Sequence, residues 1–210
     1  KPTGTPHIGN YFGAIKQAIE MSKNEEYDNL YFIADYHALN QLKTKEDLKQ
    51  YYRELACTWL ACGLDPEKVV LFKQSDVHEH AELGYIMACN SNMGELSRMT
   101  QYKDKTAKIG NNESIPTGIY IYPTLMAADI LLYDPDYIPV GVDQKQHVEL
   151  TRDLAIRFNS RYSDTFKVVE PVTAKTGAKI NSLANPNKKM SKSESDKGTI
   201  YLLEDLAITR

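Results

Sequence analysis

The first residues that could do chemistry lie in a short turn near the start of the sequence, Lys1-Pro-Thr-Gly-Thr-Pro-His7-Ile-Gly9-Asn10. Small residues that lead into a helical pattern predict a helix N-terminus, whose free backbone N–H groups and positive dipole end bind anions. His7 and Asn10 lie three positions apart, so both could donate hydrogen bonds to a phosphate in a transition state. Gly9 would allow a nucleotide to approach closely. An ordinary helix start with a glycine turn would show the same pattern, so the spacing alone leaves both interpretations open.

A second candidate site is the run Lys189-Met-Ser-Lys-Ser193, which lies in a polar, glycine- and asparagine-rich stretch. Lysines that close over a pyrophosphate leaving group stabilise its negative charges as the bond to it breaks. Lys189 and Lys192 are the candidates for that role. The alternative is a solvated basic loop, which is the usual explanation of a lysine cluster without other signals.

A third candidate is Asp129, which lies in the otherwise apolar stretch Leu125-Met-Ala-Ala-Asp-Ile-Leu-Leu132. A carboxylate is costly to bury unless it has a partner. Asp129 could accept the single N–H of an indole, and such a site would reject analogues that lack the N–H. A core aspartate that caps a loop or pairs with an arginine fits the same residues.

Alternating strands and helices would position these side chains. Helices are predicted over residues 7–21, 44–62, 78–89, 94–103, 119–133 and 144–158, and strands over 31–34, 69–72 and 137–140. This order predicts an α/β fold with a parallel sheet and right-handed crossovers. Residues 76–133 interrupt the alternation, and we interpret them as a helical insertion between two halves of a nucleotide-binding fold. Residues 173–196 are expected to form a loop.

Composition excludes several classes of protein. The chain has 210 residues, 42% of them hydrophobic and 25% charged, which is typical of a globular domain. A net charge of -3 excludes a globally basic nucleic-acid binder. The three cysteines lack metal-ligand spacing and favour a reducing compartment. No apolar run approaches the roughly 18 to 20 residues that would span a membrane.

The turn at His7-Ile-Gly-Asn10 and the later Lys189–Ser193 run together resemble the two signatures of class I aminoacyl-tRNA synthetases. Three further stretches resemble the tryptophanyl-tRNA synthetase family. They are Tyr122-Pro-Thr-Leu-Met-Ala-Ala-Asp129, Val140-Gly-Val-Asp143-Gln-Lys-Gln-His147 and Gly94-Glu-Leu-Ser-Arg-Met-Thr-Gln-Tyr-Lys-Asp-Lys105. The resemblance covers essentially all 210 residues. It implies a Rossmann-type catalytic domain with a helical insertion, which activates tryptophan and transfers it to tRNA.

The family's functional residues carry over onto matching positions of this sequence. Catalytic roles fall on His7, Asn10, Lys189 and Lys192. The expected ATP contacts are Lys1, Pro2, Thr3, Gly9, Asn10, Gly141, Val142, Asp143, Ile180, Lys189, Met190, Ser191, Lys192 and Ser193. The expected tryptophan contacts are Asp129 for the indole nitrogen, with Tyr122, Met126, Gln144 and His37 around it. His37 also follows a predicted strand, at the edge where α/β sheets bind ligands. His147 is expected to be a packing or surface residue.

Two positions depart from the family pattern. Lys1 replaces a glutamine and still favours phosphate, while Val142 replaces a glutamate at a position that offers mainly backbone groups. The resemblance further implies Mg²⁺ held mainly by the ATP phosphates, tRNA(Trp) as partner, a homodimer and a cytoplasmic location. We expect the anticodon-binding domain to be absent or truncated in this sequence, and the strand before the glycine turn to be missing.

Three alternatives remain open at this point. A tyrosyl-tRNA synthetase shares the fold but needs a partner for a phenol hydroxyl. A small-metabolite nucleotidyltransferase also has a histidine at a helix start, although the Asp143-Gln-Lys-Gln146 run argues against it. A non-catalytic paralogue that binds tryptophan is disfavoured because both signatures are intact.

Overall fold

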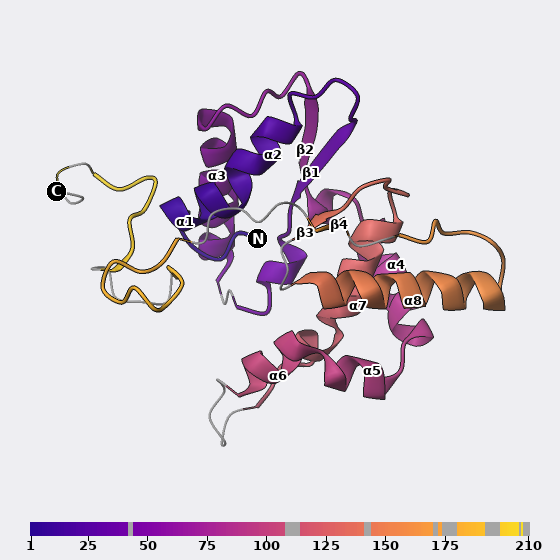
Figure 1. The fold of residues 1–210 in the computed structure, drawn as a ribbon. Coiled ribbons are helices and arrows are strands. Elements are labelled where there is room, and N and C mark those ends of the chain that lie inside the picture. Colours follow the sequence, from indigo (N-terminus) through magenta and orange to yellow (C-terminus); the bar gives the residue numbers. More distant parts are fainter. Residues whose placement is uncertain are drawn as a thin grey trace. The chain divides into compact units, whose positions relative to one another are not determined.

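The computed structural model of the chain describes residues 1–41, 44–107, 114–140, 144–169, 172–173, 180–191, 198–205 and 207. Contacts between residues divide the chain into two compact units, each described by itself below (Figure 1). The first unit comprises Lys1–Asp76 and Thr176–Arg210, and the second comprises Val77–Lys175. Each unit contains a parallel pair of strands flanked by helices, which confirms the predicted α/β fold class.

A continuous helical stretch opens the first unit. It runs through α1 (Ile8–Asn10), the π-helical turn η1 (Tyr11–Ile15) and α2 (Lys16–Met21). The helix predicted over 7–21 is therefore confirmed, and the π-helical turn in its middle is a feature that the apolar spacing did not predict. Such turns are rare and occur often near functional sites.

Strands β1 (Asn29–Ile33) and β2 (Val69–Lys73) pair in parallel, and α3 (Lys45–Ala61) connects them (Figure 1). Thr44 caps α3 by accepting a hydrogen bond from the Asp47 N–H at 3.1 Å. Gly63 follows the helix with a φ of +104°, a conformation that favours glycine. One face of the strand pair is covered, because Tyr31 and Leu71 pack with residues of η1, α2 and α3.

Short 3₁₀ helices follow both strands at their carboxyl ends, η2 (Tyr36–Ala38) after β1 and η3 (Gln74–Asp76) after β2. Asp35 joins the two strand ends. Its carboxylate accepts hydrogen bonds from the Ser75 N–H at 3.0 Å and the Ser75 hydroxyl at 2.5 Å, and from the Tyr36 N–H at 3.1 Å. These bonds fix the backbone from which His37 projects.

The second unit is mostly helical. Its elements are α4 (Glu79–Asn90), α5 (Met93–Arg98), α6 (Thr100–Thr106), α7 (Thr117–Leu131), β3 (Pro139–Val140), α8 (Lys145–Arg161) and β4 (Val172–Thr173). Strands β3 and β4 pair in parallel. Helix α7 is apolar on most sides and packs against α4 and α8, and nine of its residues are buried. The helix that carries Asp129 is thus central to this unit.

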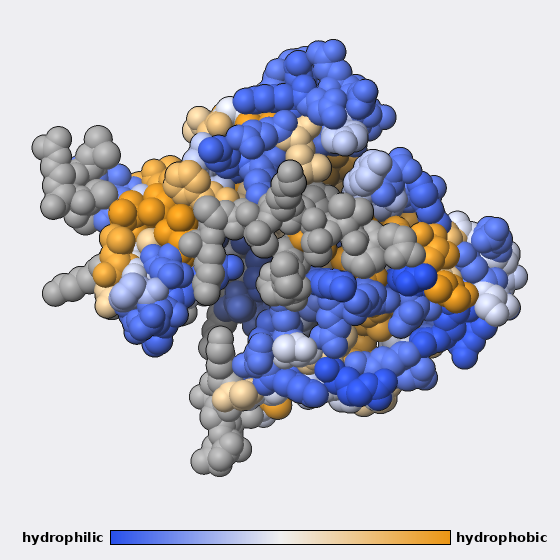
Figure 2. Space-filling view, viewed as in Figure 1, coloured by the Kyte–Doolittle hydropathy of each residue, from blue (hydrophilic) through white to orange (hydrophobic). Residues whose placement is uncertain are grey.

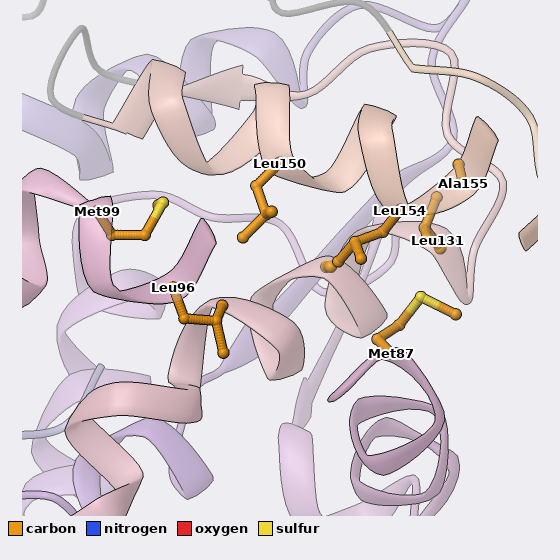
Figure 3. Close-up of a cluster of buried hydrophobic side chains, with 8 residues drawn as sticks. Met87, Leu96, Met99, Leu131, Leu150, Leu154 and Ala155 are labelled. Atoms are coloured by element: carbon orange, nitrogen blue, oxygen red, sulfur yellow. The ribbon is translucent and has the colours of Figure 1, made fainter. Parts of the chain in front are cut away.

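Side chains from four helices form the core of the second unit (Figure 3). Met87 comes from α4, Leu96 from α5 and Leu131 from α7, and they meet Leu150 and Leu154 of α8. Met87 and Leu154 are completely buried. Close packing of this kind holds helices at fixed positions, so the polar side chains on α4, α7 and α8 have rigid supports.

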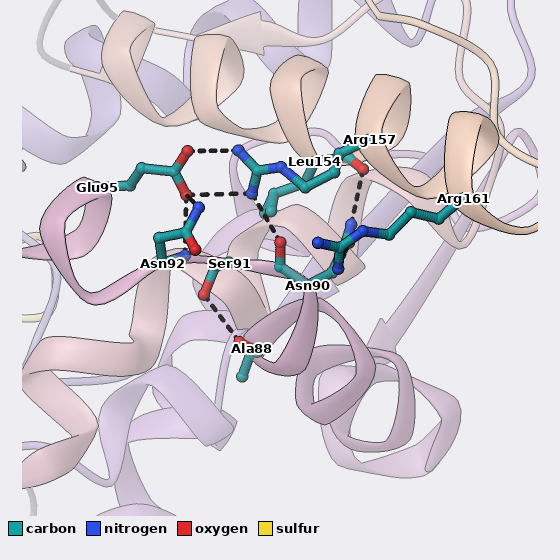
Figure 4. A network of polar contacts seen from close by, with 8 residues as sticks. All are labelled: Ala88, Asn90, Ser91, Asn92, Glu95, Leu154, Arg157 and Arg161. Carbon is teal, nitrogen blue, oxygen red and sulfur yellow. Dashed lines mark hydrogen bonds and ion pairs between the residues drawn. The ribbon is translucent and has the colours of Figure 1, made fainter.

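A polar network ties α4, α5 and α8 together (Figure 4). Arg157 binds Glu95 with two guanidinium nitrogens, one contact being 3.1 Å, and donates to the Asn90 carbonyl oxygen at 2.6 Å. The Asn90 amide donates to the Leu154 carbonyl oxygen at 3.0 Å, and Glu95 accepts from the Asn92 N–H at 2.9 Å. The hydrogen bonds from Arg157 hold the pKa of Glu95 below its ordinary value of 4.5.

Two predicted elements are wrong in detail. The single helix predicted over 94–103 is broken at Met99, whose ψ of 126° is extended. The break turns Met99 into the core, where it is 3% exposed, while the Thr100 N–H donates to Gln146 Oε1 at 2.9 Å. The strand predicted over 137–140 is confined to Pro139–Val140, and Tyr137 is exposed.

The surface in view is largely hydrophilic, with separate hydrophobic areas (Figure 2). Among the helices of the described ranges, none is both long and apolar enough to cross a membrane.

Candidate functional site

The glycine turn forms a closed structure around His7, which is the N-cap of α1 and is 5% exposed. Asn10 Oδ1 accepts from the His7 N–H at 3.0 Å, and the His7 side chain accepts from the Asn10 N–H. This reciprocal pairing is a capping box in which histidine and asparagine take the usual roles of serine and glutamate. The predicted proximity of His7 and Asn10 is confirmed.

Gly9 is required by the ring of His7. A Cβ atom at position 9 would lie 2.9 Å from His7 Cε1 and 2.9 Å from Nδ1, closer than real Cβ contacts. The sequence predicted a close approach at Gly9 by a nucleotide, whereas the nearest group in the chain is this imidazole. Gly9 therefore lets the histidine fold back over the first helical turn.

The structure brings the second motif to this turn. The Met190 Cβ lies 3.6 Å from the Cβ position of Gly9, and Met190 is 3% exposed. The Met190 N–H donates to the Ile180 carbonyl oxygen at 3.0 Å, and Asn181 and Lys189 form an antiparallel bridge. The Ile8 N–H donates to the carbonyl oxygen of Ile200 at 3.0 Å. The two motifs, which lie near opposite ends of the sequence, thus contact each other in the first unit.

Several predicted ATP contacts therefore gather in the first unit, and the others lie outside the described residues. Pro2 is completely buried, and the Thr3 N–H donates to the Lys1 carbonyl oxygen at 3.1 Å, which closes the turn. Lys189 is exposed, and Ile180 and Ser191 are half-buried. The predicted contacts outside the described residues are Gly141, Val142, Asp143, Lys192 and Ser193.

Three of the predicted tryptophan contacts lie on one face of α7, because Tyr122, Met126 and Asp129 are spaced four and three residues apart. Met126 packs against the apolar cluster of Ile130 and Val148. A mixed face of this kind, with an aromatic ring, a thioether and a carboxylate, suits an amphipathic aromatic ligand. Gln144 is the N-cap of α8 in the same unit, and His37 lies in η2 of the first unit.

Tyr122 is held by groups from two neighbouring helices. Its hydroxyl lies 2.8 Å from His147 Nε2 of α8 and donates to Gln101 Oε1 of α6 at 3.2 Å. The Lys105 Nζ lies 3.8 Å from the centre of the Tyr122 ring, within the range of a cation–π interaction. Burial raises the pKa of the Tyr122 hydroxyl to about 12, so the phenol is neutral at physiological pH. His147 is buried, and it contributes a specific hydrogen bond in addition to packing.

Asp129 is paired with His80 of α4, rather than with an arginine. The distance from Asp129 Oδ1 to His80 Nδ1 is 2.7 Å, and His80 Nε2 lies 2.7 Å from the Tyr133 hydroxyl. The side chains of His80 and Asp129 are 0% and 4% exposed. Burial, with the negative charges of Asp129 and Glu79, raises the pKa of the Tyr133 hydroxyl. The cost of burying the carboxylate is thus offset by a hydrogen-bonded partner.

The helix crossing next to this pair is unusually close. A Cβ at Gly84 of α4 would lie 3.2 Å from Leu125 Cδ1 and 3.4 Å from Leu125 Cα of α7. Gly84 is one helical turn after His80, and Leu125 is one turn before Asp129. The absence of a side chain at Gly84 therefore lets α4 and α7 approach closely enough for the 2.7 Å contact.

Sequence reasoning missed His80 and Tyr133. The only signal was a histidine on the helix after the second strand and a tyrosine four residues beyond Asp129. Neither spacing indicates contact, because His80 and Asp129 are 49 positions apart. Within the described ranges, no group of three or more His, Cys, Asp or Glu side chains could hold a metal ion.

Comparison with known proteins shows which family this chain resembles. A family model described as tRNA synthetases class I (W and Y) matches residues 1–209. The tryptophan–tRNA ligase of Caldanaerobacter subterraneus subsp. tengcongensis is 50% identical over 206 residues, 98% of this chain and 62% of that relative. The chain thus spans about three fifths of the length of this curated relative.

The chain is also similar to solved structures of tryptophanyl-tRNA synthetases. The tryptophanyl-tRNA synthetase from Mycoplasma pneumoniae has a TM-score of 0.87 and 45% identity, covering 97% of this chain and 60% of that one. The enzyme from Campylobacter jejuni, complexed with ADP and tryptophan, has a TM-score of 0.85 and 41% identity, covering 97% and 61%.

A tyrosyl-tRNA synthetase from Aeropyrum pernix has a TM-score of 0.70 at 20% identity over 98% of this chain and 58% of that one, which shows a shared fold alone. Because the family model matches residues 1–209 of this chain, the chain belongs to the class I tRNA synthetase family for tryptophan and tyrosine.

Proposed function

We propose that this chain activates L-tryptophan with ATP, forming tryptophanyl-adenylate and pyrophosphate, as the catalytic part of a tryptophan–tRNA ligase that charges tRNA(Trp). The observation that carries the proposal is the buried carboxylate of Asp129, which lies on the same face of α7 as Tyr122 and Met126. The likeness to tryptophan–tRNA ligases at about half identity supports it.

In the tryptophan site, Asp129 accepts the hydrogen bond of the indole N–H. Met126 lies against the apolar part of the ring, and Tyr122, Gln144 and His37 surround the amino-acid end and the pocket. A carboxylate that is left without its indole partner in a buried site is costly, which gives discrimination against amino acids that lack the N–H.

In the ATP site, the turn of Gly9 and Asn10 holds the nucleotide. The remaining contacts proposed are Lys1, Pro2, Thr3, Gly141, Val142, Asp143, Ile180, Lys189, Met190, Ser191, Lys192 and Ser193. The proximity of Gly9 and Met190 supports one shared site for both motifs. The metal ion of the Mg·ATP substrate is held mainly by the phosphates of the nucleotide.

The chemistry needs no protein base, because the tryptophan carboxylate is already a nucleophile. One of its oxygens attacks the α-phosphorus of ATP, the bond from this phosphorus to the bridging oxygen breaks, and pyrophosphate leaves with the electron pair. His7 and Asn10 stabilise charge on the α-phosphoryl group, and Lys189 and Lys192 stabilise the departing pyrophosphate. A hydroxyl of the terminal ribose of tRNA(Trp) then attacks the carbonyl carbon of tryptophanyl-adenylate, the bond from this carbon to the phosphate oxygen breaks, and AMP leaves. This transfer takes place in the cytoplasm.

The proposal includes a homodimer whose interface lies on α4 and α8. Tyr85 is 73% exposed and Tyr162 is 69% exposed, which is uncommon for large aromatic residues. Together with Ile86, Cys89, Asn90 and Phe158 they line a cavity of about 280 Å³. A second copy of this chain would cover that surface. Light scattering should give twice the monomer mass, and Tyr85→Glu should give the monomer; an unchanged mass in the variant would refute this interface.

The test of the main proposal is ATP–pyrophosphate exchange with tryptophan, with tyrosine and without an amino acid. Tryptophan-dependent exchange is expected. Exchange that depends on tyrosine would assign the tyrosyl activity, and exchange without an amino acid would indicate a nucleotidyltransferase. Tryptophan binding without any exchange would identify a non-catalytic paralogue.

A further inference from the structure

His80 and Tyr133 extend the site around Asp129 beyond the predicted tryptophan contacts. His80 lies between the two other groups, with Nδ1 2.7 Å from Asp129 Oδ1 and Nε2 2.7 Å from the Tyr133 hydroxyl. The His80 and Tyr133 rings also lie 5.4 Å apart, at 49°. His80 is completely buried. A fully buried imidazole with both nitrogens engaged has little freedom to rotate.

The chemistry of the three groups assigns a direction to the hydrogen bonds. An ionised carboxylate only accepts, so Nδ1 of His80 carries the proton of the bond to Asp129. In a neutral imidazole Nε2 is then an acceptor, and the Tyr133 hydroxyl donates to it. The bonds thus run from Tyr133 to His80 to Asp129, and no net charge beyond the carboxylate is buried.

We infer that His80 is a positioning residue for tryptophan recognition, because its Nδ1–H holds one oxygen of Asp129 and so aims the carboxylate at the indole N–H. A carboxylate has about four lone-pair sites on its two oxygens, so the bond to His80 is compatible with a second acceptor role. Tyr133 acts one step further out, by favouring the imidazole form that carries the proton on Nδ1. The inference rests on the proposed function, in which Asp129 accepts the indole N–H.

A purely structural role would predict something different. If His80 only satisfied a buried carboxylate, any substitution would lower stability and would reduce the use of all amino acids alike. A positioning role predicts a selective loss, because the hydrogen bond to the indole N–H weakens while apolar contacts to the ring remain. Discrimination between tryptophan and an isostere without the N–H separates the two roles.

Two substitutions of His80 test the two ring nitrogens separately. In His80→Asn the side-chain amide nitrogen occupies the place of Nδ1, so it keeps a donor toward Asp129. In His80→Gln the amide nitrogen reaches the place of Nε2 instead, so the Asp129 contact is lost. Both variants introduce a neutral amide of similar polarity, so each is the matched control of the other. Tyr133→Phe removes the outer donor and leaves His80 in place.

The measurement is kcat/KM in ATP–pyrophosphate exchange for tryptophan and for β-(benzothiophen-3-yl)alanine, with equilibrium dialysis of labelled tryptophan as a second readout. The ratio of the two kcat/KM values should fall about tenfold or more in His80→Gln, as expected for a weakened bond to a charged group. In His80→Asn this ratio should stay within about threefold of the value for the unsubstituted chain. In Tyr133→Phe the ratio should decrease slightly. Thermal unfolding of each variant checks that it is folded.

The unsubstituted chain supplies a test that needs no variant to fold well. In ¹⁵N-histidine spectra the His80 ring should show its proton on Nδ1, which is the less common form of neutral histidine, and His80→Asn assigns the signal. A ring protonated only on Nε2 would overturn the inference. So would an unchanged ratio in His80→Gln, or equal losses of the ratio in both His80 variants.

Failure of the proposed function would look different. The unsubstituted chain would then neither bind tryptophan nor support tryptophan-dependent exchange, and the inference would fall with it. Failure of the inference alone leaves the unsubstituted chain active and selective, with only the pattern among the variants contradicting it.

Discussion

At the scale of single residues, Asp129 is the acceptor on which the proposed tryptophan selectivity depends. Asp129→Asn should leave ATP binding nearly unchanged and lower kcat/KM for tryptophan, because the amide can turn its donor end toward the indole N–H. Losing a charge-assisted hydrogen bond costs about 1.5 to 3 kcal/mol. Exchange kinetics with tryptophan and phenylalanine check this. If the variant discriminated between tryptophan and phenylalanine as strongly as the unsubstituted chain, Asp129 would not be the group that binds the indole N–H.

Gly9 gives a second prediction at this scale. In Gly9→Ala the new methyl group would lie 2.9 Å from the His7 ring, so the ring must leave its place and the capping contact with Asn10 is lost. We expect adenylate formation to fall at least tenfold, with a decrease in unfolding free energy of about 1 kcal/mol, the usual cost of a lost cap. Single-turnover adenylate formation and urea unfolding measure the two effects.

The matched control is Gly13→Ala in the π-helical turn, where nothing lies within 4 Å of the new methyl group. Alanine has the higher helix propensity, by about 0.8 to 1 kcal/mol, so Gly13→Ala should maintain or raise stability. If the two variants behaved alike, the close approach of His7 to Gly9 would have no consequence.

At the scale of helices, the Glu95–Arg157 pair joins α5 to α8. Arg157→Ala removes the partner of Glu95 and the bond to the Asn90 carbonyl oxygen, and should lower the unfolding free energy by about 1.5 to 3 kcal/mol at pH 7. Lys145→Ala is the control, because it removes the cation of an exposed ion pair with Glu149. It should lower the unfolding free energy by only about 0.3 to 0.5 kcal/mol.

This pair also predicts a pH dependence. The pKa of Glu95 is lower in the folded chain than its ordinary value of 4.5, so the unfolded chain binds the proton more readily. The stability that the pair contributes is fully present above about pH 4.5. It disappears as the pH falls through the folded pKa. Urea unfolding between pH 3.5 and about 7 should therefore show the difference between Arg157→Ala and the original chain shrinking at acid pH. A difference that grows on acidification would contradict the assignment.

The close crossing of α4 and α7 gives another prediction for helices. Gly84→Leu places a side chain where the Leu125 backbone lies 3.4 Å from the Cβ position, so the helices must separate. Overpacking should cost about 1 to 3 kcal/mol of stability. Because His80 and Asp129 lie one turn away on the same helices, KM for tryptophan should rise more than KM for ATP. Glu82→Leu, at an exposed position of α4, is the control and should change neither. Equal changes in both KM values would argue against this coupling.

At the scale of the whole molecule, the proposed ligands divide between the two units. Among the described residues, the proposed ATP contacts lie in the first unit, and the proposed tryptophan contacts other than His37 lie in the second. Hydrogen exchange should therefore slow in 1–21 and 180–191 when an ATP analogue binds, and in α7 and α8 when tryptophan binds. Protection by tryptophan confined to the first unit would refute the assignment of its site to α7.

Much of the local structure was predictable from the sequence, because it depends on neighbouring residues. The helices predicted over 7–21, 44–62 and 144–158 are present, and Thr44 and Gly63 delimit α3 through contacts with neighbouring residues. The break at Met99 was not predictable in this way. It arises because the Met99 side chain is buried among residues of other helices, and propensity within the segment carries no information about that.

Residue types at fixed spacing were enough to predict the α/β class, the family, the two motifs that we propose bind ATP, and the need of the carboxylate at position 129 for a partner. The groups that surround those residues became apparent only in the folded chain. The tertiary structure placed Met190 against Gly9 and identified His80, rather than an arginine, as the partner of Asp129. Helix packing determines which side chains become partners, because it brings together residues that are not related by any sequence spacing. Here the small volume of Gly84 against Leu125 allows α4 and α7 to approach closely.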